Sequence, residues 1–114
     1  MTKKVSYDQE NDILVVHRGF DAGEKFKGNI DVGGIVLDVS TTGKIRGIEL
    51  FNASQFLKPF IDQGNEEFTL ENILDADFNA KISPNGIIIN ILIKSKKNEV
   101  PAMIAVPLEK PIMG

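Results

Sequence analysis

Short runs of alternating hydrophobic and polar residues recur along the chain, the pattern of half-buried β-strands. These runs predict strands near residues 4–7, 13–18, 35–39, 44–51, 77–83, 86–95 and 100–106, with turn-forming residues between them. Residues 19–34 contain five glycines and scattered charge, so we expect a loop and a short edge strand there. The sequence therefore predicts a predominantly antiparallel β-sheet of about seven strands.

Two short segments carry helix signals. Asn52 followed by Gln55 resembles a capping box and predicts a helix near residues 53–58, which Pro59 should end. Thr69 is placed to cap a second helix near residues 69–75. With two short helices packed on the sheet, the predicted fold class is α+β.

The segment IVLDVSTTGKIRGIELF is the clearest hairpin in the sequence. Its turn, STTG, predicts a three-residue loop in which Gly43 takes the left-handed backbone conformation. The resulting register pairs Val39 with Ile45, Asp38 with Arg46, and Val36 with Ile48.

Glu49 lies in the second strand of this hairpin. Alternation puts Ile48 and Leu50 on one face and Glu49 with Phe51 on the other. Burial of an unpaired carboxylate is costly, so Glu49 must reach a sheet edge, accept hydrogen bonds, or lie at an interface. The sequence leaves these three alternatives open.

The strand GIIINILIK is apolar on both sides, with Asn90 between Ile88 and Leu92 on its second face. Such a strand is typical of the middle of a sheet that is covered on both faces. We therefore expect a helix or a partner subunit to cover Asn90.

Composition fits one compact domain over residues 1–114, with 42% hydrophobic and 25% charged residues. The absence of cysteine excludes disulfides and thiolate chemistry. No apolar run is long enough for a membrane span, and MTKKVSYD lacks the apolar core of a signal peptide, so we expect a cytoplasmic protein without membrane association. A net charge of -3 disfavours nucleic acid, and a solvated hairpin tip explains the basic residues of IKSKKNEV.

The segments SYDQENDILVVH and GGIVLDVSTTGKIRGIELFNAS resemble the small prokaryotic family catalogued as domain of unknown function 2283. The matching positions are Tyr7, Asp8, Asp12, Asp38, Gly43, Gly47, Ile48 and Glu49. The resemblance covers about residues 5–57 and implies no activity that can be transferred. The chain departs from the family in having STTG where many members have an acidic turn, and in lacking the usual tyrosine in ILVVHR. These departures argue against a ligand site in the turn itself.

Catalytic motifs are absent from the sequence. His17 shares strand parity with Ile13 and Val15, which favours a packed or edge histidine over a general base. No serine occupies a nucleophile elbow, and the glycines lack the spacing of a phosphate-binding loop.

The acidic turn at residues 8–12 imitates part of a calcium loop. Asp8, Glu10 and Asp12 match its first three ligand positions, but Ile13 replaces the required glycine and Gly19 the bidentate glutamate. We therefore expect turn formation by these side chains, and no metal or cofactor.

Two functions from different classes remain. The favoured one is a non-catalytic protein-interaction module that acts as a homodimer and can bind a further protein partner. The reason is that the chain has more two-faced apolar strand than its two short helices can cover. The alternative is a small-molecule-binding protein or enzyme with an acidic pocket around Tyr7, Asp8, Asp12 and Glu49. A dimer would bury the face of Glu49 against itself, whereas a pocket would leave all four residues lining a cavity.

Overall fold

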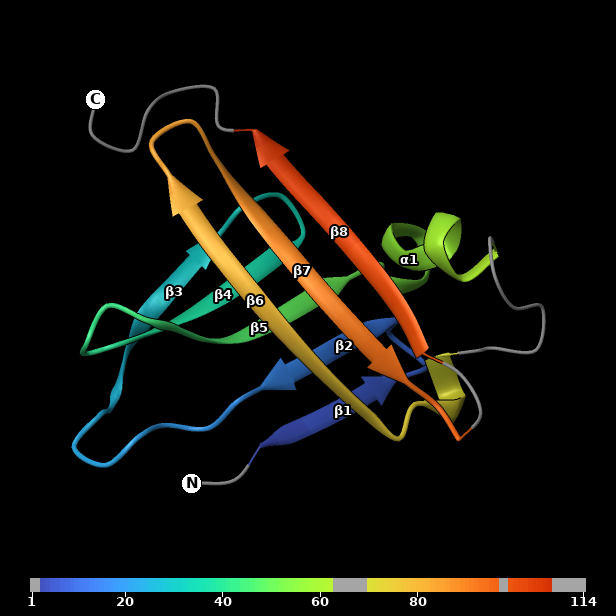
Figure 1. Cartoon of the computed structure of the whole chain (residues 1–114), viewed down its shortest axis with the longest axis horizontal. Coiled ribbons are helices and arrows are strands. Elements are labelled where there is room, and N and C mark those ends of the chain that lie inside the picture. The colour runs from blue at the N-terminus through green and yellow to red at the C-terminus, as the bar shows by residue number, and fades with distance from the viewer. Residues whose placement is uncertain (1–2, 63–69, 97–98, 108–114) are drawn as a thin grey trace.

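Two antiparallel sheets form the fold (Figure 1). The computed structural model describes residues 3–62, 70–96 and 99–107, and this part of the chain contains eight strands. The first sheet has the strand order β1-β2-β5-β4-β3 and the second has the order β6-β7-β8. The strands of the first sheet are β1 (Lys4–Asp8), β2 (Ile13–His17), β3 (Phe26–Asp31), β4 (Ile35–Ser40) and β5 (Ile45–Phe51). Those of the second are β6 (Asp75–Ser83), β7 (Gly86–Lys94) and β8 (Glu99–Pro107).

The second sheet lies across the first, and its three long strands run at a steep angle to the five strands behind them (Figure 1). Apolar side chains from the facing sides of both sheets make one core. Ile48 and Leu50 of the first sheet and Ile89 and Ile93 of the second are all fully buried. Helix α1 (Ala53–Asp62) packs beside β8 and adds Leu57 to this core.

The seven expected strands are confirmed to within two residues at each end, but the described part of the chain has eight. The additional strand is β3, at the edge of the first sheet, in the region expected to hold a short edge strand. Its apolar alternation is weak, with Phe26 and Ile30 as its large hydrophobic residues. Backbone pairing with β4 holds β3 in the sheet, and hydrophobic periodicity does not reveal such pairing.

The expectation of two helices is wrong, because the described residues contain one α-helix. The second expected helix, at residues 69–75, is only a 3-10 turn over Leu70–Asn72, and Thr69 lies outside the described residues. The backbone N–H of Leu74 donates to the carbonyl of Lys94 at 2.8 Å. The chain is therefore already joined to the second sheet where the helix was expected to continue.

Helix α1 also runs past its expected end, through Pro59 to Asp62. A proline removes its own N–H donor and strains the preceding turn, but burial of apolar side chains opposes this cost. Leu57, before Pro59, is fully buried, and Phe60 and Ile61, after it, pack against the core. Tertiary packing thus outweighs the local signal.

The β4–β5 turn confirms part of the predicted hairpin. Gly43 has a φ of +80°, its N–H donates to the carbonyl of Ser40 at 2.9 Å, and Val39 pairs with Ile45. The other two predicted pairs are wrong: Asp38 pairs with Gly47, and Val36 pairs with Glu49.

A β-bulge causes this change of register. Arg46 is the extra residue of β5, between Ile45 and Gly47, and its side chain is buried while Asp38 lies on the other face. Alternation resumes beyond the bulge, so the predicted faces of Ile48 and Glu49 are retained.

Helix α1 has ten residues, and no helix in the described ranges combines the length and apolarity that a bilayer span requires.

Candidate functional site

Tyr7 and Asp12, two of the four residues singled out in the sequence, are joined by a hydrogen bond. The Tyr7 hydroxyl donates to Asp12 Oδ1 at 2.6 Å. The same carboxylate accepts the backbone N–H of Ser54 at 3.0 Å and the Ser54 hydroxyl at 2.6 Å. Asp12 therefore caps the first turn of α1, a role that the sequence had assigned to Asn52.

The protonation states of this pair suit a fixed structural contact. Burial, followed by the hydrogen bond to Asp12, raises the pKa of Tyr7 to about 12. Burial also acts to raise the pKa of Asp12, but the hydrogen bonds from Ser54 and Tyr7 outweigh it and lower that pKa. A neutral phenol and an ionised carboxylate are thus both stabilised at neutral pH, and the contact locks the β1–β2 turn onto α1.

Asp8 and Glu49 lie elsewhere. Asp8 accepts the backbone N–H of Asn11 at 3.1 Å and its side-chain amide at 2.8 Å, and the latter bond lowers the pKa of Asp8. Glu49 is half-buried on the outer face of the first sheet, between Val15 and Val36 in the paired strands. Because β5 is the middle strand of five, Glu49 does not reach a sheet edge.

A hollow of about 390 Å³ lies beside Tyr7 and α1. Its lining includes Tyr7, Gln55, Lys58 and Glu71, whereas Asp8, Asp12 and Glu49 do not contribute to it. The structure therefore divides the four predicted residues among a helix cap, a turn and an open sheet face. The hypothesis of a small-molecule site stays a prediction, because these four residues do not line one acidic pocket.

His17 shares the outer face of the first sheet with Glu49. Its Nε2 lies 4.0 Å from Asp38 Oδ2, its Nδ1 accepts the backbone N–H of Gly19 at 2.9 Å, and its ring meets Phe20 edge-on. A Cβ on Gly47 would lie 2.5 Å from the His17 ring. Gly47 thus leaves the space in which His17 and Asp38 approach each other, a role its sequence context does not reveal. This geometry agrees with the packed histidine that strand parity predicted.

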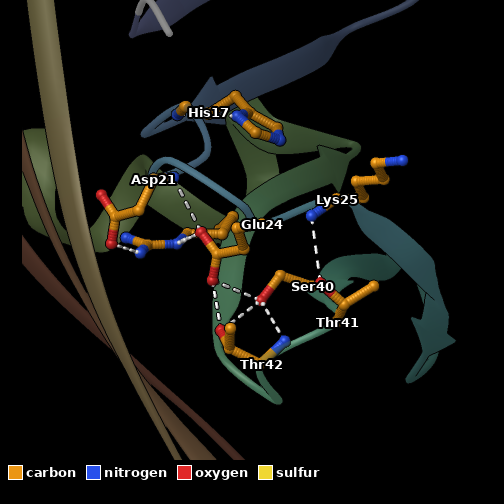
Figure 2. A network of polar contacts seen from close by, with 9 residues as sticks. His17, Asp21, Glu24, Lys25, Ser40, Thr41 and Thr42 are labelled. Carbon is orange, nitrogen blue, oxygen red and sulfur yellow. Dashed lines mark hydrogen bonds and ion pairs between the residues drawn. The ribbon is translucent and has the colours of Figure 1, made fainter.

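The largest polar network in the described residues surrounds Glu24 (Figure 2). Its carboxylate accepts hydrogen bonds from the Ser40 hydroxyl at 2.6 Å, from Arg46 Nε at 2.7 Å, and from the Thr42 hydroxyl. Arg46 also pairs with Asp21 through its terminal guanidinium nitrogen. The network ties the glycine-rich segment before β3 to the β4–β5 hairpin and explains why the bulge turns Arg46 inward.

Glu24 is charged and stable in this setting. The hydrogen bonds from Ser40 and Thr42, followed by the smaller contribution of Arg46, lower the pKa of Glu24 to about 2. The bond to Glu24 in turn raises the pKa of Arg46. The sequence does not reveal this network, because the bonds that join the two segments span 16 to 25 residues and the bulge brings Arg46 to Glu24. We interpret it as a structural brace.

The outward side of the second sheet, which carries Asn79, Asn90 and Met103, is here named the β6–β8 outer face. Its apolar side chains are exposed in this chain: Ile88 is 45% and Met103 57% exposed. The central position predicted for β7 is confirmed, but within the described residues no element covers its second face. A shallow hollow of about 580 Å³ borders this face, with Asn90 and Met103 in its lining.

These features define a small domain of two crossed antiparallel sheets with an internal polar brace and an exposed apolar sheet face. The chain belongs to the family described as Protein of unknown function (DUF2283), whose model matches residues 4–54. It is 33% identical over 100 residues to Uncharacterized protein MJ0789 of Methanocaldococcus jannaschii, with 85% of this chain and 79% of that protein covered. The matched region therefore extends beyond the first sheet into the second. No solved structure matches the chain significantly.

Proposed function

We propose that the protein is a non-catalytic interaction module that forms a homodimer through its β6–β8 outer face. One observation carries this proposal: β7 buries Ile89 and Ile91 on its inner side yet presents Ile88 to solvent on its outer side. Clustered apolar side chains on an open sheet face are typical of interaction sites, whereas single exposed ones are not.

The edges of the second sheet support pairing through its face. β8 is an edge strand and carries Pro101 and Pro107, which provide no backbone N–H for an added strand. At the other edge, Arg18 Nε lies 3.5 Å from Asp77 of β6. Extension of the sheet by a second chain is therefore disfavoured at β8, which favours pairing through the open face over pairing at that edge.

The outer face of the first sheet is the other candidate. Glu49 lies near the middle of its central strand, and Asp38 lies on the neighbouring strand. Two-fold pairing of this face would bring Glu49 close to its own copy, and burial of like charges is unfavourable. We therefore place the contact on the second sheet, a revision of the sequence-based expectation that the face of Glu49 is buried.

The face is small for a protein–protein interface. Three nine-residue strands, spaced about 4.8 Å apart and rising about 3.4 Å per residue, cover roughly 450 Å² in projection per copy. Stable specific interfaces bury about 800 Å² per partner. Interfaces at the low end of the size range are typical of weak, transient association, so we expect a reversible dimer that exchanges with the monomer.

Sedimentation velocity over a concentration series tests this proposal. The wild type should show monomer–dimer exchange, and Ile88→Lys should remain monomeric because the new charge would be buried in the contact. Phe26→Lys is the matched control, since Phe26 is 53% exposed on β3, outside the proposed contact. A wild type that stays monomeric up to about 1 mM, or a control variant that abolishes association as fully as Ile88→Lys, would refute the proposal.

A further inference from the structure

Five rows of outward-facing residues cross the strands of the β6–β8 outer face. The end rows consist of Ser83, Gly86 and Pro107 and of Asp75, Lys94 and Glu99, and three rows lie between them. One row consists of Lys81, Ile88 and Ala105. The middle row consists of Asn79, Asn90 and Met103. The third consists of Asp77, Leu92 and Pro101. The two rows that flank the middle row, named the outer rows of the contact, both carry apolar residues on β7 and β8 but opposite charges on β6.

We propose that two copies pack face to face around a two-fold axis along the middle row, with Asp77 of each copy opposite Lys81 of the other. This inference rests on the proposed homodimer and specifies its geometry. Rotation about such an axis places β6 on the partner's β6 and β8 on the partner's β8, while it exchanges the two outer rows. Each dimer then contains two equivalent Asp77–Lys81 contacts, and Ile88 lies opposite Leu92 of the partner subunit.

The alternative two-fold axis runs along the strands. It would place β6 on the partner's β8, so that Asp77 faced Pro101 and Lys81 faced Ala105. Desolvation of two charges against apolar side chains, without a partner for either, is strongly unfavourable. The distribution of charge on β6 therefore selects the axis along the middle row.

Asn90 lies on the selected axis and meets its own copy there. An amide side chain both donates and accepts, so two Asn90 side chains can satisfy each other across the axis. A single buried polar residue of this kind is a known means of fixing the register of a symmetric contact. This geometry accounts for the amide that stands between Ile88 and Leu92 on an otherwise apolar strand face.

The contacts of Asp77 within its own chain are compatible with this pairing. Arg18 Nε lies 3.5 Å from Asp77 Oδ1, and the same oxygen accepts the backbone N–H of Phe78 at 2.9 Å. Among the described residues both contacts involve Oδ1, so Oδ2 is available to Lys81 of the partner subunit. Asp77 and Lys81 are both exposed in the single chain.

Charge reversal tests the register. Asp77→Lys and Lys81→Asp should each weaken self-association at least about tenfold, because each creates two like-charge contacts per dimer. An equimolar mixture of the two variants should associate with an affinity close to that of the wild type, since both cross-contacts are then attractive. Sedimentation velocity at two ionic strengths would measure this, with thermal melts by circular dichroism to verify folding.

Lys27→Asp and Asp31→Lys form the matched control, because these residues also lie four positions apart on an exposed strand, β3, in the other sheet. Neither control variant should weaken association, and their mixture should bring no gain. If Asp77→Lys does not fold because the new lysine faces Arg18, a double variant takes its place. Asp77→Asn combined with Lys81→Asp in one chain should self-associate more tightly than Lys81→Asp alone, because the neutral amide removes the repulsion.

The outcomes separate the register from the dimer itself. A wild type that dimerises while the charge-reversal mixture associates no better than its components would overturn the register and leave the proposed function intact. A wild type that never associates would overturn both. A mixture that gains affinity no more than the control mixture also counts against the register.

Discussion

Replacement of Ile91 by alanine measures how far β7 is embedded in the core. Ile91 is 2% exposed on the inner face of the central strand, and the substitution removes three carbon atoms. At about 0.8 kcal/mol per buried methylene, the transfer term alone is roughly 2.4 kcal/mol. The cavity left behind adds to it, so we expect Ile91→Ala to lower the free energy of unfolding by about 2 to 5 kcal/mol.

Chemical denaturation monitored by circular dichroism provides the measurement, at a protein concentration low enough to keep the chain monomeric. Ile88→Ala is the matched control on the same strand, since Ile88 is 45% exposed on the opposite face. We expect the control to change the unfolding free energy by about 0.5 kcal/mol or less. Equal losses for both variants, or a loss below about 0.5 kcal/mol for Ile91→Ala, would contradict the two-sheet core.

Three further predictions concern the first sheet. Tyr7 is the sole tyrosine of a chain without tryptophan, so its ultraviolet titration should show a pKa near 12, which Asp12→Asn should lower; an ordinary value near 10 would contradict the buried contact. Gly47→Ala should destabilise the fold by about 1–3 kcal/mol in denaturant titrations, because its Cβ would lie 2.5 Å from the His17 ring; an unchanged midpoint would refute this crowding. The folded-state pKa of Glu24 is depressed to about 2. Its stabilising contribution should therefore be complete above the usual glutamate pKa and lost as the pH falls from about 4.5 towards 2. In a plot of unfolding free energy against pH, Glu24→Gln should flatten this region.

The strands were predictable because their signal is local. Period-two alternation placed Ile89 and Ile91 in the core, and the left-handed conformation of Gly43 followed from the turn sequence. The central position of β7 followed from apolar residues on both of its sides, although the structure leaves the second side open. Each of these features depends on residues that are close in sequence.

The missed features depend on contacts between distant residues. The bulge turns Arg46 towards Glu24, which lies 22 positions away, so the hairpin sequence alone favoured the regular register that paired Arg46 with Asp38. The helix cap was assigned to Asn52 because the sequence around α1 does not contain Asp12, which reaches Ser54 across 42 positions. Both errors arise where a tertiary hydrogen bond outweighs a local rule.

The candidate site was only partly predictable for the same reason. Tyr7 and Asp12 do meet, because a tight turn joins their strands. Glu49 was placed on the correct strand face, but Tyr7 pairs through Leu14 with Leu50 and therefore lies on the opposite face of the sheet. Alternation within single strands does not report this pairing. The rows of the β6–β8 outer face became visible only once the pairing of three strands was known.

A distance between two copies of the chain tests the proposed dimer most directly. The chain has no cysteine, so Ser83→Cys provides a single position for a spin label at the exposed end of β6. Ser83 lies four residues from the middle row, and sheets pack about 10 Å apart, so the two labels should be roughly 30 Å apart in the proposed dimer. Pulsed electron resonance at high protein concentration should show this distance. A distance of roughly 14 Å would indicate the axis along the strands, and the absence of any intermolecular distance would contradict the dimer.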